Sequence, residues 1–232
     1  MISVIIPVYN QANKIIRTIK SLEAQTFKDF EVIIIDDGSS DSLSEVVGKY
    51  LENSQMTNAF YIFRQKNLGA PAARNFGFKK SKGEFLFFLD ADVILAPKAL
   101  RTYLDVLSNN PSASYSYSSF YFGNKLFKLE EFSPERLRRA PFISTMSLIR
   151  RSDFPVEMWD TNLKKFQDWD LYLTMLKHGH GGVFINQALW KAITGGTMSV
   201  WLPGFAYKLM PWLTRVKKYN EALKVIKFKH KL

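Results

Sequence analysis

The segment FLFFLDADVILAP, residues 85–97, brings two aspartates to the end of an apolar run. Burying an isolated carboxylate is costly unless a partner compensates its charge. In extended backbone, residues two apart point to the same side, so Asp90 and Asp92 would repel each other without a cation between them. Mg²⁺ or Mn²⁺ meets this demand, because both ions prefer oxygen ligands and bridge to phosphates. The alternative is that Asp92 caps a following helix or turn.

Two other stretches carry groups suited to a nucleotide. DDGSSD, residues 36–41, doubles the carboxylate at a strand end, where it can accept hydrogen bonds from ribose hydroxyls or a base N–H. The alternative is a turn in which Ser40 or Asp41 caps the next helix. In QKNLGAPAARNFG, residues 65–77, Arg74 can reach a phosphate or a carboxylate, whereas the alanines also suit ordinary helix packing.

Short apolar runs alternate with helical patterns over the first hundred residues. Continuous hydrophobicity predicts strands that are covered on both faces, at 3–8, 30–36, 59–64 and 84–90. Helical patterns lie between them at 11–25, 41–53 and 69–80. This alternation predicts an α/β fold with a mostly parallel central sheet flanked by helices. Because ligands bind beyond the carboxyl ends of such strands, the polar stretches are expected to meet at one edge.

The rhythm changes after residue 97. The pattern predicts a helix at 97–109 and then a small antiparallel portion with a Gly-Asn turn. Further on it predicts a short helix beginning after Ser133, a strand at 143–151 and a helix at 167–179. Residues 1–200 are therefore expected to form the main domain, and residues 201–232 a C-terminal tail with aromatic residues and a basic amphipathic helix.

The composition restricts the kinds of bonds, metal sites and binding partners that the chain can have. The chain has no cysteine, which excludes disulfides and zinc–thiolate sites. Its formal net charge is +11, which favours anionic partners, and residues 208–232 carry eight Lys or Arg against one Glu. The apolar N-terminus lacks a basic leader and a small-residue cleavage site, and no apolar stretch of about 20 residues occurs. A cytoplasmic protein is therefore expected.

Six stretches together resemble the nucleotide-sugar transferases of glycosyltransferase family 2, which have the GT-A, Rossmann-like fold. The resemblance spans about residues 2–200, with every stretch in the family's order. The stretches are VIIPVYN (4–10), DDGSSD (36–41), NLGAPAARNFG (67–77), FLDADV (88–93), SLIRRSDF (147–154) and FQDWDLYLTML (166–176).

The resemblance implies a role for each matching residue on the donor side. Pro7 and Tyr9 would flank the nucleoside, and Asp37 would contact the base. Arg74 would contact the nucleotide. Asp90 would hold the ribose or a metal-bound water. It is therefore assigned to both the nucleotide-sugar site and the metal site.

On the metal and acceptor side, the resemblance implies that Asp92 binds a divalent cation, Mn²⁺ or Mg²⁺, directly. Asp168 would be the general base, with Trp169 and Asp170 shaping the acceptor-sugar site. Two positions depart from the family pattern. Gln167 stands where the family often has Glu, and Thr194 stands where a late histidine can approach the metal.

The expected function is that of an inverting, metal-dependent glycosyltransferase of cell-surface polysaccharide biosynthesis. It would move a sugar from a nucleoside-diphosphate sugar, most readily a UDP-sugar, to a hydroxyl of a saccharide or lipid-linked saccharide. One alternative is a nucleotidyltransferase, although PVYNQANK at 7–14 lacks the glycine-rich phosphate loop that such enzymes need. The other is a non-catalytic nucleotide-sugar binder. Nucleic acid is not an expected partner, because the positive charge is concentrated in the tail and no nucleic-acid-binding motif occurs.

The tail leaves two interpretations open. Lysines interleaved with Val216, Tyr219, Leu223, Ile226 and Phe228 suit peripheral attachment to the inner face of the cell membrane. The alternative is a helix that packs back on the domain and exposes a solvated charged face.

Overall fold

The computed structural model describes residues 1–54, 56, 59–193 and 212–232. These residues form one nine-stranded sheet, in the order β3-β2-β1-β4-β8-β6-β9-β5, with β7 paired to β6. Its strands are β1 (Ile2–Val8), β2 (Phe30–Asp36), β3 (Phe60–Arg64), β4 (Phe85–Phe88), β5 (Val93–Leu95), β6 (Tyr115–Phe122), β7 (Lys125–Phe127), β8 (Leu148–Arg150) and β9 (Gly182–Ala192).

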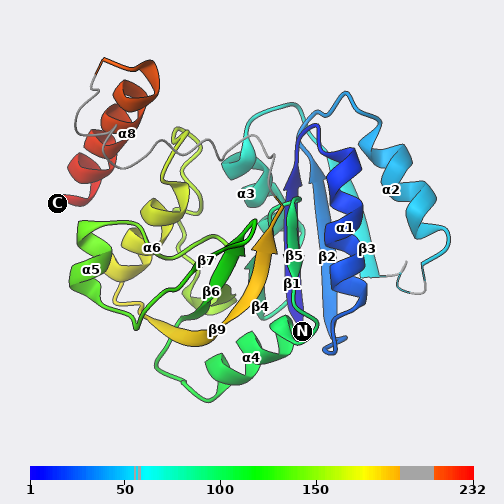
Figure 1. Cartoon of the computed structure of the whole chain (residues 1–232), viewed down its shortest axis with the longest axis horizontal. Coiled ribbons are helices and arrows are strands. Elements are labelled where there is room, and N and C mark those ends of the chain that lie inside the picture. The colour runs from blue at the N-terminus through cyan, green and yellow to red at the C-terminus, as the bar shows by residue number, and fades with distance from the viewer. Residues whose placement is uncertain (55, 57–58, 194–211) are drawn as a thin grey trace.

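Helices cover both faces of the sheet (Figure 1). One hydrophobic core joins the sheet to α1 (Ala12–Glu23), α2 (Leu43–Leu51) and α4 (Ala99–Ser108). A second core, on the other face, joins it to α3 (Ala70–Lys80), α5 (Pro134–Arg139), α6 (Gln167–Lys177) and α8 (Thr214–His230). The predicted fold class is confirmed: an α/β chain with a mostly parallel central sheet, a smaller antiparallel portion and a C-terminal helix.

The parallel block positions the polar loops. Strands β3, β2, β1 and β4 run parallel, and both faces of β1 and β2 are buried, as their continuous apolar sequences predict. The loops after these four strands leave from the same edge of the sheet. The order reverses between β1 and β4, and such a reversal opens a crevice in a parallel sheet.

One glycine sets the distance between α3 and this block. A Cβ added at Gly77 would lie 2.4 Å from Ile5 Cγ2 on β1 and 3.3 Å from Ile35 Cγ1 on β2. Only a residue without a side chain lets the helix approach the sheet so closely. The glycine in the NLGAPAARNFG stretch therefore fixes the height of Arg74 above the sheet.

Several local predictions need correction. The predicted strand at 84–90 ends at Phe88, so Asp90 and Asp92 lie on a turn rather than on extended backbone. That turn leads into β5 and not directly into a helix. The predicted strand at 143–151 is reduced to β8, and β9 was not predicted. Both discrepancies have the same cause, since the missed or shortened strands gain their partners only through long-range pairing.

The predicted helix cap in DDGSSD is also wrong. The N-cap of α2 is Ser42, in the left-handed region at φ 54°, with no side-chain capping bond. Asp41 instead accepts a hydrogen bond at 2.8 Å from the backbone N–H of Ala12, the first residue of α1. The carboxylate thus caps the N-terminus of a helix that begins 29 positions earlier in the sequence. Ser133 does cap α5 as predicted, because its hydroxyl accepts from the Arg136 N–H.

Candidate active site

A buried arginine lies at the centre of the polar edge. Arg74 is 2% exposed, and its two terminal nitrogens bond to different parts of the chain. Nη2 donates to Asp90 Oδ1 at 3.0 Å, and Nη1 donates to Gln167 Oε1 at 2.9 Å. The guanidinium therefore joins the turn after β4 to the first residue of α6, across 93 positions of sequence. Charge-assisted bonds of this kind fix both partners in direction as well as distance.

The residue after Gln167 is Asp168, which is half-buried at the start of α6. Burial raises the pKa of its carboxyl above the usual value, and the Asp90 charge adds to this effect. The Trp169 N–H and the Arg74 charge pull the pKa in the opposite direction. A carboxylate whose pKa is raised is a stronger base than an ordinary aspartate, which suits it to take a proton. Asp168 and Asp90 are thus close enough for their charges to interact, although no direct bond joins them.

Two hydrogen bonds account for the amide at position 167, where the family often has Glu. Its side-chain oxygen accepts from Arg74, and its side-chain nitrogen donates to the Leu163 carbonyl at 2.9 Å. A glutamate has no donor for that carbonyl. The neutral amide leaves Asp90 as the only carboxylate paired with Arg74 among the described residues.

Asp90 and Asp92 interact with each other on their turn. Burial raises the pKa of Asp92, and repulsion from the Asp90 charge raises it further, whereas Lys14 lowers it. Two neighbouring carboxylates supply the hard oxygen ligands that Mg²⁺ or Mn²⁺ prefers, and a cation between them would offset the repulsion of their charges. The donor set therefore fits a divalent cation. Within the described ranges, no group of three or more His, Cys, Asp or Glu residues forms a metal cluster.

Asp36 and Asp37 of DDGSSD accept hydrogen bonds from loop residues of the protein itself. Asp37 is 3% exposed and accepts three hydrogen bonds, from Gln65 Nε2 at 2.7 Å and from the backbone N–H groups of Leu68 and Gly69 at 2.9 and 2.8 Å. Asp36 accepts from the Ser39 N–H at 2.7 Å. Asp37 therefore shapes the loop that leads into α3, and its predicted contact with a base stays a prediction.

The remaining donor-side residues lie on the same edge. Tyr9 follows β1 and is 49% exposed, and Pro7 lies within that strand. The Asn10 side chain accepts from the Ser40 N–H at 2.8 Å, which ties the first polar loop to the second. Pro7, Tyr9, Asp37, Arg74 and Asp90 are thus brought to one end of the parallel block, as the sequence predicts.

The two predicted acceptor residues face away from solvent. Trp169 is fully buried, and its indole N–H donates to the Leu137 carbonyl on α5 at 2.6 Å. Asp170 is 2% exposed, and its carboxylate bonds to Lys229 and His230 of α8. Their predicted roles in shaping an acceptor site stay predictions. Thr194, the position of the family's late histidine, lies outside the described residues, whereas Ile193 donates its N–H to the Asp92 carbonyl at 2.8 Å.

Sequence reasoning missed Trp159, which packs against the central arginine. The Arg74 guanidinium carbon lies 4.7 Å from the centre of the Trp159 ring, a cation–π distance. Asn75 fixes this tryptophan by exchanging two hydrogen bonds with its backbone, at 2.8 and 3.0 Å. Asn75 follows Arg74 in the NLGAPAARNFG stretch, but nothing in that stretch identifies a partner 84 residues away.

The sequence and the fold both match known transferases. A family model described as "Glycosyl transferase family 2" matches residues 3–191. A protein of Rickettsia conorii described as an uncharacterized glycosyltransferase is 33% identical over 213 residues, which are 84% of this chain and 33% of that protein. The chain thus spans about a third of the length of that relative.

Among solved structures, Staphylococcus aureus TarS 1–349 in complex with UDP-GlcNAc aligns with a TM-score of 0.70 and 21% identity, over 91% of this chain and 64% of that one. The mannosyltransferase PcManGT of Pyrobaculum calidifontis, in complex with GDP-Man and Mn²⁺, aligns with a TM-score of 0.67 and 17% identity. That alignment covers 82% of this chain and 56% of that one. At these identities the likeness concerns the fold, and it agrees with the predicted GT-A fold.

Proposed function

Because this chain belongs to glycosyltransferase family 2, we propose that it transfers a sugar from a nucleoside-diphosphate donor to an acceptor hydroxyl. The expected donor is a UDP-sugar, and the expected acceptor is a saccharide or lipid-linked saccharide of cell-surface polysaccharide synthesis. The observation that carries this proposal is the Arg74 bridge. One buried cation bonds to Asp90 on the donor side and to Gln167, the neighbour of Asp168, on the other side.

Each residue has a chemical task in this proposal. Asp168 accepts the proton of the attacking hydroxyl, and positioned proton transfer of this kind contributes about 10²–10⁴-fold to rate. The hydroxyl oxygen bonds to the anomeric carbon as the bond to the diphosphate breaks, so the anomeric configuration inverts. Arg74 keeps the two halves of the site in register, and Pro7, Tyr9 and Asp37 frame the nucleoside.

Asp92 and Asp90 would hold the divalent cation. When bound, Mn²⁺ or Mg²⁺ supplies Lewis-acid stabilisation of the charge that develops on the departing diphosphate. Such ions commonly complete their coordination with substrate phosphates and water, so two protein carboxylates on one turn suffice. The complex of PcManGT with GDP-Man and Mn²⁺ supports this assignment by fold likeness.

Calorimetry of UDP binding, with and without Mn²⁺, tests the proposal. We expect UDP to bind the full chain in the presence of Mn²⁺ and Asp92→Asn to abolish the metal dependence. A matched control is Asp105→Asn, which removes a carboxylate that pairs only with the exposed Arg101. No binding of UDP or of any other nucleoside diphosphate, with oligonucleotides bound instead, would contradict the proposal.

A donor panel then identifies the sugar and separates the alternatives. UDP-, GDP- and dTDP-sugars are compared by the thermal stabilisation they give, since a ligand that binds only the folded state raises its melting temperature. Turnover of the stabilising donor to free nucleoside diphosphate supports a transferase. Binding without turnover in the presence of candidate acceptors supports the non-catalytic binder. In a parallel assay, release of pyrophosphate from a nucleoside triphosphate supplied with a sugar phosphate supports a nucleotidyltransferase.

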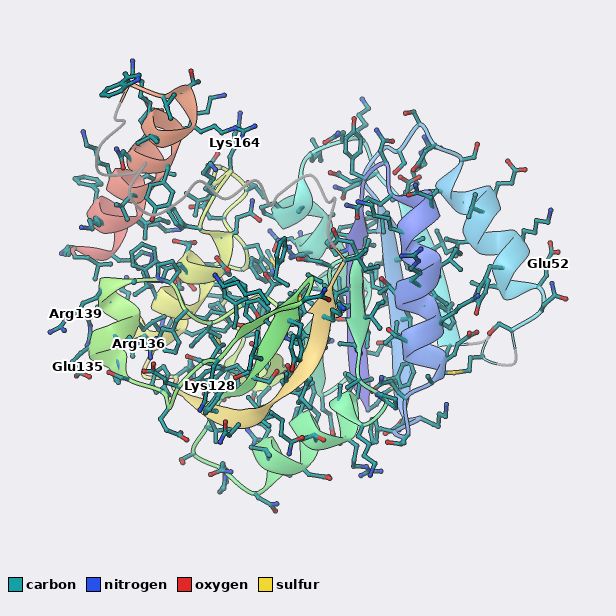
Figure 2. All side chains as sticks on the ribbon, viewed as in Figure 1. Glu52, Lys128, Glu135, Arg136, Arg139 and Lys164 are labelled. Carbon is teal, nitrogen blue, oxygen red and sulfur yellow. The ribbon has the colours of Figure 1, made fainter. Side chains whose placement is uncertain are left out.

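We further propose that the outer face of α8 contacts an anionic membrane surface. The helix packs one side on the domain and leaves Lys217, Lys224 and Phe228 exposed, the last at 90%. Arg139 and Lys164 lie at the same end of the molecule (Figure 2). Basic residues near an anionic bilayer contribute about 1 kcal/mol each. No helix among the described residues is long and apolar enough to cross a membrane.

Liposome sedimentation at low salt tests this contact. We expect the full chain to co-sediment with vesicles that contain anionic lipid and to remain in solution with neutral vesicles. Replacing both Lys217 and Lys224 by Glu should abolish co-sedimentation, because the two changes remove two positive charges and add two negative ones. Equal recovery with both vesicle types would contradict the proposal.

A further inference from the structure

The C-terminal helix is attached to α6, the helix that carries Asp168. Its inward side buries Val216 and Ile226 completely. Leu223 packs against the second hydrophobic core, and Tyr219 meets Phe166 edge-on with ring centres 5.1 Å apart. Phe166 immediately precedes the first residue of α6. The match to the family model ends at residue 191, so α8 lies outside the matched residues.

A charged clamp closes this contact. Lys229 Nζ lies 2.9 Å from the Asp170 carboxylate and 2.7 Å from Asp160 Oδ2. His230 Nε2 lies 2.7 Å from Asp170 Oδ1. The side chains of Asp170 and His230 are 3% and 7% exposed, so the bond between them is shielded from water, whereas the Lys229 side chain is 37% exposed. A buried carboxylate needs such partners, because it loses its hydration on burial.

The clamp acts on the first turn of α6, two residues beyond Asp168. Asp170 donates its N–H to the Phe166 carbonyl at 2.9 Å, so the clamped residue also closes that turn. Three residues before Asp170 in the same turn, Gln167 is held by Arg74. The turn is therefore fixed from two directions, by Arg74 from the donor side and by α8 from the tail.

We propose that Lys229 and His230 are positioning residues, which hold the first turn of α6 so that Asp168 keeps its place relative to Arg74 and Asp90. This inference rests on the proposed function for the role of Asp168. In this view Asp170 acts through the helix and does not touch the acceptor. Helix α8 would then contribute to the catalytic rate, in addition to its proposed contact with a membrane surface.

Hydrogen–deuterium exchange of the full chain tests the positioning without any substrate. In Lys229→Gln/His230→Gln we expect amides of residues 167–177 to exchange at least about tenfold faster, since opening the clamp frees the turn. The matched control is Lys227→Gln, which removes the same charge from the same helix at an exposed position. Unchanged exchange in α6 while α8 itself exchanges faster would overturn the proposal.

Kinetics with the donor and water or acceptor separates positioning from mere stability. We expect Lys229→Gln to lower kcat about tenfold with little change in the donor KM, and Lys229→Arg to restore most of the rate. If the double variant does not fold, these single variants carry the test. An unchanged kcat in a folded Lys229→Gln whose α6 exchanges faster would overturn the proposal.

The two proposals fail in different ways. If the unmodified chain binds no nucleoside diphosphate and turns over no donor, the proposed function fails, whereas the exchange experiment still reports whether α8 holds α6. If donor turnover is normal in both the clamp variants and the Lys227→Gln control, the positioning fails and the proposed function stands.

Discussion

The loops of the parallel block and the first turn of α6 are both built around buried aspartates, but they stabilise them differently. Asp36 and Asp37 accept most of their bonds from backbone N–H groups of neighbouring loops. Asp170 depends on the side chains of Lys229 and His230, 59 and 60 residues away. A backbone N–H is fixed once its loop is in place, whereas a lysine must also hold a long, flexible side chain in one conformation.

The difference divides the site into a self-contained part and an assembled part. The donor-side loops bond to one another within the parallel block, because Asp37 after β2 accepts from Gln65, Leu68 and Gly69 of the loop after β3. Asp168 takes its environment from its burial, from Arg74 on α3 and from Asp90 on the turn after β4, and we propose that the clamp on α8 keeps it in place. We therefore expect donor binding to tolerate changes in the C-terminal half, and the catalytic rate to be sensitive to them.

The largest effect should follow from Asp168→Asn, which removes the proposed base but keeps its shape. We expect kcat to fall by about 10²–10⁴-fold while Mn²⁺-dependent UDP affinity stays within about twofold. Steady-state kinetics and calorimetry measure the two quantities. The Asp105→Asn variant is the control, and an unaltered kcat in Asp168→Asn would remove this residue from the reaction.

Arg74→Lys tests the connection between the two regions. A lysine cannot bond to Asp90 and Gln167 with the same fork geometry, and each lost charge-assisted bond costs about 1.5–3 kcal/mol. We expect kcat/KM to fall by about 10–100-fold, read from initial rates. If the two regions worked independently, the loss would appear only in the donor affinity.

Asp37→Asn tests the self-contained part. The amide supplies one acceptor oxygen where the carboxylate supplies two, so its NH₂ group would face a backbone N–H. We expect a loss of unfolding free energy of about 1–3 kcal/mol, measured by urea denaturation. Weaker UDP binding at unchanged stability would instead support the predicted contact with the base.

Gly77 tests the packing of α3 against the sheet, and Gly48 provides the matched control. Gly77→Ala forces a Cβ to 2.4 Å from Ile5 Cγ2, and we expect it to lower the unfolding free energy by about 1–3 kcal/mol. Gly48→Ala lies in α2 with no atom within 4 Å of the new Cβ. It should raise stability by about 0.5–1 kcal/mol through helix propensity, and the opposite sign would contradict this account.

The smallest effect concerns pH. Burial raises the pKa of Asp168, so kcat/KM should rise with pH through a limb that lies above the usual aspartate pKa of about 3.9. Below that limb the carboxyl is protonated and cannot act as a base. Lys229→Gln leaves the Asp170 charge less compensated, which should move the limb to higher pH. If the limb lies at the same pH in Lys229→Gln and in the unmodified chain, the proposed coupling between the clamp and Asp168 is contradicted.

Much of this arrangement follows from the sequence. Continuous apolar runs predicted the strands β1 to β4, and the helical patterns between them predicted the parallel order. Burial on both faces is confirmed for β1 and β2 but wrong for the edge strand β3, where Tyr61 is 46% exposed. Because the loops after parallel strands share one edge, the sequence predicted that the polar stretches with Tyr9, Asp37 and Asp90 lie at the same edge of the sheet. The motif order also led to the family to which the chain belongs.

Only the tertiary structure decided which groups pair. Asp41 caps α1 rather than α2, Trp159 lies over Arg74, and Asp170 bonds to the tail. Periodicity reports whether a residue faces a core, because neighbours three or four positions apart share a helix face. It carries no information on contacts between residues 29 to 93 positions apart, since those depend on how the elements pack. The tail illustrates this limit: its helix was predictable, whereas the carboxylate that holds it was not.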